Sequence, residues 1–129
     1  MKVMLFLLCA CAAFADDVFL NNESDYPVKQ QSKMAVQWAS SGREVDEANN
    51  ASLMGKALNP NSLQMITSQG KVRLSAPKNA EYFRILVWSK EGGGEPDLMT
   101  NWVEVVSKKH YTLTTDKLFP AVLMYGTGC

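Results

Sequence analysis

The chain has 129 residues, in which 13 lysine and arginine residues balance 13 aspartate and glutamate residues. A neutral chain with no basic run lacks the concentrated positive charge that nucleic-acid phosphates and anionic membrane surfaces attract, so we expect no nucleic-acid partner. The length fits one domain, long enough to bury a core of its own.

Residues 1–15 have the three-part pattern of a secretory signal. Lys2 precedes an unbroken apolar run over residues 3–13, and Ala13-Phe14-Ala15 supplies small residues where a signal peptidase would cut. The run is shorter than the roughly 20 apolar residues that an anchor across a bilayer needs.

We therefore predict a signal peptide at residues 1–15 and a single mature domain at residues 16–129. The mature domain is expected to be secreted, or periplasmic in a bacterium, with no stable membrane insertion. Two alternatives remain for the N-terminal segment: a buried core element, or a lipid attachment at Cys11.

Strand signals dominate the predicted mature domain. Short segments of alternating or continuous apolar residues, separated by Gly, Pro, Asn or Ser, are typical of strands joined by turns. The segment YFRILVW at 82–88 is nearly continuous, which predicts a central strand covered on both faces. The other expected strands lie at 18–20, 33–38, 63–67, 72–74, 101–106, 110–114 and 120–125.

Two β-hairpins are expected from neighbouring strand signals. The first joins 63–67 to 72–74 and turns at Gln69-Gly70. The second joins 101–106 to 110–114 across Ser107-Lys108-Lys109.

The fold class that these signals predict is an all-β, two-sheet sandwich of seven or eight strands, immunoglobulin-like or transthyretin-like in architecture. Residues 44–58 fit a short helix or a strand pair equally well, because Asn49-Asn50 and Gly55 interrupt the helical spacing. The space between the sheets is expected to hold Val36, Trp38, Ile85, Val87, Val103, Val105, Leu113 and Leu123.

Cysteine usage excludes an internal disulfide in the predicted mature domain, because Cys129 is its sole cysteine. It is either an exposed free thiol or one half of an intermolecular disulfide, which would make a homodimer. Two glycosylation sequons, at Asn22 and Asn50, are expected in surface loops and would carry sugar in a eukaryotic secreted protein.

No catalytic or metal-binding motif is found. His110 is the sole histidine and is expected to be exposed in a hairpin, and no nucleophile elbow or metal-ligand spacing occurs. Glu44, Asp46 and Glu47 form an acidic cluster that fits a solvated face better than a calcium loop or a pair of hydrolase carboxylates. We predict no enzyme, no cofactor and no metal.

The glycine-rich segment that follows the central strand is the candidate binding site. Three consecutive glycines give the backbone freedom, and a tryptophan stands at each end of the segment, where it could anchor a partner or pack beneath the loop. The residues of this site are Trp88, Gly92, Gly93, Gly94, Asp97 and Trp102.

The leading functional hypothesis is a non-enzymatic binding module that recognises a protein or glycan through loops at one end of the sandwich. The alternative is a self-associating structural or surface protein, through a Cys129 disulfide or the addition of an edge strand. A carboxylate-dependent hydrolase is the least favoured.

Overall fold

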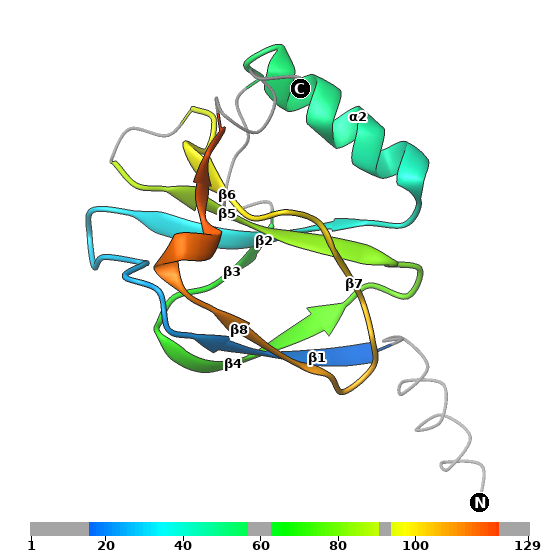
Figure 1. Cartoon of the computed structure of the whole chain (residues 1–129), viewed down its shortest axis with the longest axis horizontal. Helices are drawn as coiled ribbons and strands as arrows, with labels where there is room; N and C mark the ends of the chain where they lie inside the picture. Colours follow the sequence, from blue (N-terminus) through cyan, green and yellow to red (C-terminus); the bar gives the residue numbers. More distant parts are fainter. Residues whose placement is uncertain (1–15, 57–62, 91–93, 122–129) are drawn as a thin grey trace, which may run out of the picture.

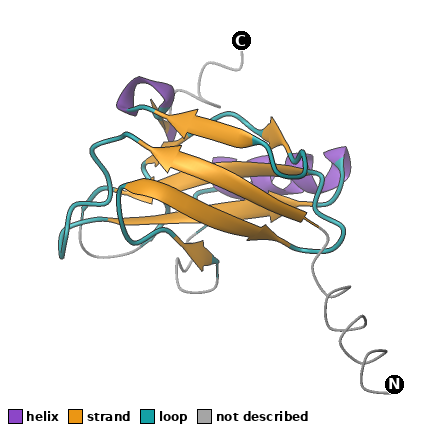
Figure 2. Cartoon of the chain, turned by 90° about the horizontal axis from the view of Figure 1, so that it is seen from below, coloured by secondary structure: helices purple, strands orange, loops and turns teal. Residues whose placement is uncertain are grey.

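The computed structural model describes residues 16–56, 63–90 and 94–121, which form two β-sheets, one α-helix and one 3-10 turn (Figure 1). The sheets face each other as a sandwich, which confirms the predicted fold class. The α-helix lies on the outer face of the larger sheet. Seen from below, the smaller sheet stands in front and the helix behind (Figure 2).

The larger sheet is built around β5 (Tyr82–Trp88), which is buried from Phe83 onward, as its apolar sequence predicts. β5 pairs along its whole length with β2, antiparallel, and on its other side with β6 and β7. The strand order is β3-β2-β5-β6-β9, with β7 beside β5. The bounds are β2 (Lys33–Ala39), β3 (Gln64–Met65), β6 (Leu98–Met99), β7 (Val103–Glu104) and β9 (Phe119–Pro120).

The smaller sheet has three strands in the order β4-β1-β8. β1 (Asp16–Asn22) pairs antiparallel with all seven residues of β4 (Gly70–Ala76). On its other side β1 pairs in parallel with β8 (His110–Leu113). Parallel neighbours need a long connection, and here it runs through the larger sheet.

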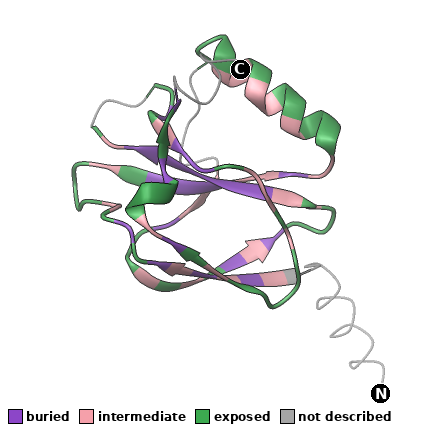
Figure 3. Ribbon diagram, in the orientation of Figure 1, coloured by how far each residue is buried: buried purple, intermediate pink, exposed green. Residues whose placement is uncertain are grey.

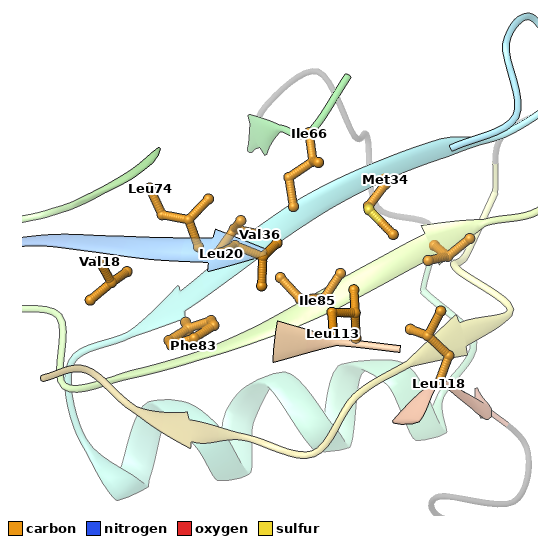
Figure 4. Packing of buried hydrophobic residues seen from close by; sticks show 11 residues of the cluster. Val18, Leu20, Met34, Val36, Ile66, Leu74, Phe83, Ile85, Leu113 and Leu118 are labelled. Atoms are coloured by element: carbon orange, nitrogen blue, oxygen red, sulfur yellow. The ribbon is translucent and has the colours of Figure 1, made fainter. Parts of the chain in front are cut away.

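The core lies between the sheets, and Figure 4 shows its side chains converging from both. Val18, Leu20 and Leu74 come from the smaller sheet and are at most 2% exposed. Each such side chain contributes about 1.5–3 kcal/mol on burial. The facing residues of the larger sheet are Met34, Val36, Phe83, Ile85 and Val87, and Ile66, which follows β3, packs beside them.

The predicted core layer is largely confirmed. Val36, Ile85, Val87 and Leu113 are buried in the core, while Trp38, Val103 and Val105 are half-buried against it. Leu123 lies outside the described residues.

Helix α2 (Gly42–Leu53) occupies the segment that the sequence left open between helix and strand pair. Ser41 caps it, with its Oγ accepting from Glu44 N–H at 3.2 Å, and Gly55 ends it with a φ of +70°. The helix contains no buried residue (Figure 3). Its apolar residues Val45, Ala48 and Ala51 are half-buried.

Both predicted hairpins are wrong, because each pair of strands belongs to different sheets. β3 pairs with β2, whereas β4 pairs with β1. Between them the chain crosses the sandwich, with Ile66 buried in the core. Alternation marks a strand but does not identify its partner.

The second predicted hairpin fails in the same way. β7 pairs with β5, and the chain then crosses to β8 beside β1. Lys108 makes the crossing turn with a φ of +62°, and its N–H donates to Asp17 O at 2.7 Å.

The described residues hold nine strands rather than seven or eight, because two-residue pairings such as β6 and β9 leave no pattern in the sequence. Of the strand expected at 120–125, only its start is described, as the end of β9. Within the described ranges, no helix has the length and apolarity to cross a membrane.

Candidate functional site

On one long side of the sandwich, the side chain of Gln64 in β3 bonds the outer edge of β4. Its Oε1 accepts from Ser75 N–H and its Nε2 donates to Arg73 O, both at 3.3 Å. These β4 groups point away from β1, so the amide of Gln64 takes the place of a neighbouring strand. The centre of the β4 edge is therefore occupied.

The opposite side of the sandwich is open along β8. A hollow of about 590 Å³ lies there between β8 and the larger sheet, and we name it the β8 groove. That volume is in the range of roughly 300–1,000 Å³ typical of ligand pockets. Two other hollows, of about 410 and 360 Å³, are smaller.

The β8 groove has an apolar floor and a polar rim. Its floor is made by Leu20, Phe83, Ile85 and Leu113, all at most 3% exposed. The rim and walls carry Thr100, Asn101, Val103, His110, Tyr111, Thr112, Asp116, Lys117 and Phe119. Phe119 is 38% exposed, so an apolar surface reaches the solvent at the mouth.

Tyr111 makes one end wall of the β8 groove. Its ring packs edge-on against Phe83 with centroids 5.0 Å apart, and its hydroxyl donates to Glu104 O at 2.6 Å. Burial raises the pKa of the Tyr111 hydroxyl; a hydrogen bond with the Val106 backbone partly opposes this rise, and the nearby Glu104 carboxylate adds to it. The phenol therefore stays protonated at neutral pH and keeps donating.

The outer edge of β8 faces the mouth of the groove. In the parallel pairing, Phe19 N–H donates to Lys109 O and Glu23 N–H to Leu113 O, so alternate residues of β8 bond to β1. The backbone groups of His110 and Thr112 point the other way. Within the described part of the chain, their two N–H groups and the His110 carbonyl have no hydrogen-bond partner.

The fourth outward group, Thr112 O, accepts from Lys117 Nζ at 2.7 Å. Lys117 follows β8 in the 3-10 turn Thr115–Lys117 and is exposed. A lysine on an edge strand is a common guard against unwanted strand pairing. An exposed lysine also leaves its acceptor at little cost, so the edge can be uncovered.

The predicted loop site is only partly described, because Gly92 and Gly93 lie outside the described residues. Trp88 is 3% exposed, and its indole N–H donates to Gly94 O at 3.1 Å. Asp97 accepts from both the N–H and the hydroxyl of Ser89. Trp88, Gly94 and Asp97 are thus brought together, with Trp88 packing beneath the loop.

Trp102 belongs to a different cluster, under helix α2. Its indole N–H and Arg84 Nη1 both donate to Asn49 Oδ1 at 3.1 Å. The Arg84 guanidinium lies 4.5 Å from the centre of the Trp102 ring, a cation–π contact. Arg84 Nε also donates to Gln37 Oε1 at 2.7 Å.

The two glycosylation sequons differ in exposure. Asn22 is 1% exposed and its Nδ2 donates to Tyr26 O and Ser68 O, so the expectation that it lies on the surface is wrong. It ends β1 and turns inward to bond the crossing chain. Asn50 is exposed, although on helix α2 rather than in a loop. Cys129 lies outside the described residues.

His110 is exposed, as expected, but on β8 instead of in a hairpin, and its ring stacks on Phe19 with centroids 4.9 Å apart. Of the acidic cluster, Glu44 caps helix α2, and Asp46 and Glu47 are exposed on it. Across the described residues, no group of three or more His, Cys, Asp or Glu side chains could hold a metal ion.

Sequence reasoning missed the residues that shape the two edges of the smaller sheet, at β4 and at the β8 groove. Gln64, Tyr111 and Lys117 act through contacts between segments that the strand pairing alone brings together. A polar residue in an alternating apolar segment, as at Gln64, was the one available signal. Neither protein-family models nor curated proteins match the sequence of this chain.

Proposed function

We propose that this chain is an exported, non-enzymatic binding module that holds a partner in the β8 groove. On one side of the sandwich, Gln64 bonds two backbone groups at the centre of the β4 edge. The observation that carries the proposal is the β8 groove on the other side, which combines an apolar floor, exposed Phe119 and unused backbone groups. Such a combination is typical of binding sites.

Export of residues 16–129 is part of the proposal. The signal pattern of residues 1–15 supports it. The test is the N-terminal sequence of the protein recovered from outside the cytoplasm. A chain recovered there with Met1 intact would contradict the cleavage.

The binding experiment compares three variants of the mature chain. Asn101→Trp places an indole across the mouth of the β8 groove from an exposed rim position. Lys78→Trp adds the same side chain at an exposed turn outside the groove lining, as the matched control. Asp97→Ala releases the loop that the sequence singled out.

Each variant is immobilised and exposed to the extracellular or periplasmic fraction of the native cells. We expect one retained protein that Asn101→Trp loses and that Lys78→Trp and Asp97→Ala keep. Loss only with Asp97→Ala would move the site to the glycine-rich loop. Equal retention by all variants would overturn the groove as the binding surface.

A further inference from the structure

We infer that β8 accepts an extended peptide segment of the partner as an additional strand, and that this segment alternates apolar with acidic residues. This inference rests on the proposed function, because it specifies what the β8 groove holds. Three features of the described residues carry it: the backbone groups of β8, the shape of the groove and the position of Lys117.

The backbone groups provide the pairing. His110 N–H, His110 O and Thr112 N–H point away from β1 and have no partner among the described residues. Their spacing is that of one face of a ladder, which an extended chain satisfies with its own N–H and C=O groups. The smaller sheet would then have four strands.

The groove provides the side-chain specificity. Tyr111 and Leu113 face the core, so every second residue of an added strand would also point inward. Those residues would meet Ile85, Val103 and Phe119 in the β8 groove. Apolar side chains at alternate positions fit this surface, and they would cover the exposed part of Phe119.

Lys117 provides the charge preference. Its ammonium bonds Thr112 O, the one outward β8 group that is occupied. A peptide N–H would take over that carbonyl, and the released ammonium would then pair with a carboxylate on the outward face of the peptide. Lys109 also precedes β8, with its Nζ 5.2 Å from the centre of the Tyr111 ring, and the carboxylates of Asp116 and Glu104 lie on the same side. The acidic preference therefore comes from the released ammonium of Lys117.

The same charges argue against a second copy as the occupant. Pairing of two β8 edges would bring Lys109 and Lys117 of both copies to one interface. β8 itself, His110–Leu113, contains no acidic residue that could pair with the released Lys117 of the other copy. A partner segment with carboxylates fits this edge better than β8 itself.

The test uses the mature chain and two short acetylated and amidated peptides, one alternating valine with glutamate and one alternating valine with lysine. Thr112→Pro removes the outward N–H of β8 without touching the bonds to β1, a position where an edge strand tolerates proline. Thr112→Ala keeps the N–H and is the matched control. Dissociation constants are measured by calorimetry, and circular dichroism confirms that each variant is folded.

We expect the glutamate peptide to bind at least about tenfold more tightly than the lysine peptide. Thr112→Pro should weaken binding of the glutamate peptide about tenfold, whereas Thr112→Ala should not. Lys117→Ala should weaken binding of the glutamate peptide, because the ammonium that pairs with its carboxylates is gone. It should strengthen binding of a valine–serine peptide, because it leaves Thr112 O open to the peptide backbone. Equal binding to Thr112→Pro and Thr112→Ala, a preference for lysine, or no peptide binding would overturn the inference.

Failure of this inference is distinguishable from failure of the proposed function. If the partner retained by the mature chain is lost with Asn101→Trp but unaffected by Thr112→Pro, the groove binds its partner without strand addition. If Asn101→Trp also has no effect, the groove is not the binding surface and both proposals fail.

Discussion

Asn22 shows how one buried side chain links three segments of the chain. Its Nδ2 donates to Tyr26 O at 2.8 Å and to Ser68 O at 3.2 Å, and its Oδ1 accepts from the N–H and the hydroxyl of Ser24. Every hydrogen-bonding position of the amide is therefore used inside the fold. A buried amide with all its hydrogen bonds made fixes the positions of the segments that it joins, and its removal is costly.

We expect Asn22→Ala to lower the free energy of unfolding by about 2–4 kcal/mol, because buried backbone and hydroxyl groups lose their partners. Asn21→Ala on the same strand is the control, since the Asn21 side chain donates only to exposed Glu23, and it should cost about 0.5 kcal/mol or less. Urea unfolding measures both. Similar losses for the two variants would contradict the role given to Asn22.

Glu44 makes the start of helix α2 sensitive to acid. Its Oε1 accepts from Ser40 N–H at 2.8 Å, and this bond to the backbone of Ser40 lowers the pKa of the carboxyl. A carboxyl with a lowered pKa stabilises the folded form above its ordinary value, near 4.3. That stabilisation is lost as the pH falls through the lower pKa of the folded state.

The corresponding prediction compares the wild type with Glu44→Gln, which keeps an acceptor but cannot ionise. We expect the wild type to be the more stable at pH 7 and the difference to shrink below about pH 4, as the carboxyl protonates. Hydrogen exchange of helix α2 across this range reports it. A difference that is independent of pH would mean that the charge of Glu44 does not matter.

At the scale of elements, helix α2 is attached to the larger sheet by hydrogen bonds. No residue of the helix is buried, and Asn49 Oδ1 is the shared acceptor for Arg84 and Trp102. A helix held in this way can detach while the sandwich stays folded. The Asn49 amide therefore takes the two shorter of these bonds, while Arg84 Nη2 also donates to Ser52 Oγ at 3.5 Å.

Asn49→Ala should accelerate hydrogen exchange throughout helix α2 and leave that of β5 unchanged. The loss of a shared acceptor costs about 1–3 kcal/mol and acts on the helix rather than on the core. Asn50→Ala is the matched control, because Asn50 is the adjacent residue and is exposed. Equal exchange in both variants would show that other contacts hold the helix.

The sequence predicted strands better than it predicted their partners. The apolar continuity of Tyr82–Trp88 identified the central strand, whereas alternation on either side of Gln69-Gly70 suggested a hairpin that does not form. The alternation of apolar residues shows which face of a strand is buried. Because both sheets bury a face in the same core, alternation does not show which sheet a strand joins. The choice of sheet depends on contacts over long distances in the chain.

Helix α2 was predictable from a signal that the periodicity obscured. Ser41 and Glu44 have the spacing of a capping box, which marks a helix start. The asparagine pair that weakened the helical pattern includes Asn49, the residue that anchors the helix. Asn49 thus lowers the intrinsic helix propensity of α2 but bonds the helix to the larger sheet.

The β8 groove could not be predicted from sequence, because its walls come from β1, β5, β8, residues 100–103 and residues 116–119. The glycine-rich segment before Asp97 was prominent in the sequence because three consecutive glycines occur there between two tryptophans. Trp88 proved to be buried beneath it. An open side of a sandwich is a property of the strand order and leaves no local motif.

For the whole molecule, the four edges of the two sheets decide whether it stays single or associates. β4 is the longest of these edges, with seven residues, and an uncovered edge of that length is a template for pairing. Gln64 covers its centre by bonding Arg73 O and Ser75 N–H. Self-association through β4 is thereby opposed by one side chain.

We expect Gln64→Ala to make the mature chain associate as its concentration rises, because it leaves the centre of the β4 edge open. Sedimentation velocity over a concentration series measures the effect.

Gln64→Glu is the control: it also loses the donor to Arg73 O, but its charge discourages pairing, so it should stay monomeric. If Gln64→Ala remains monomeric under reducing conditions, the flanking residues of β4 are sufficient to protect it. If wild type and both variants associate equally, the contact lies elsewhere, and self-association through another surface becomes the better account of this molecule.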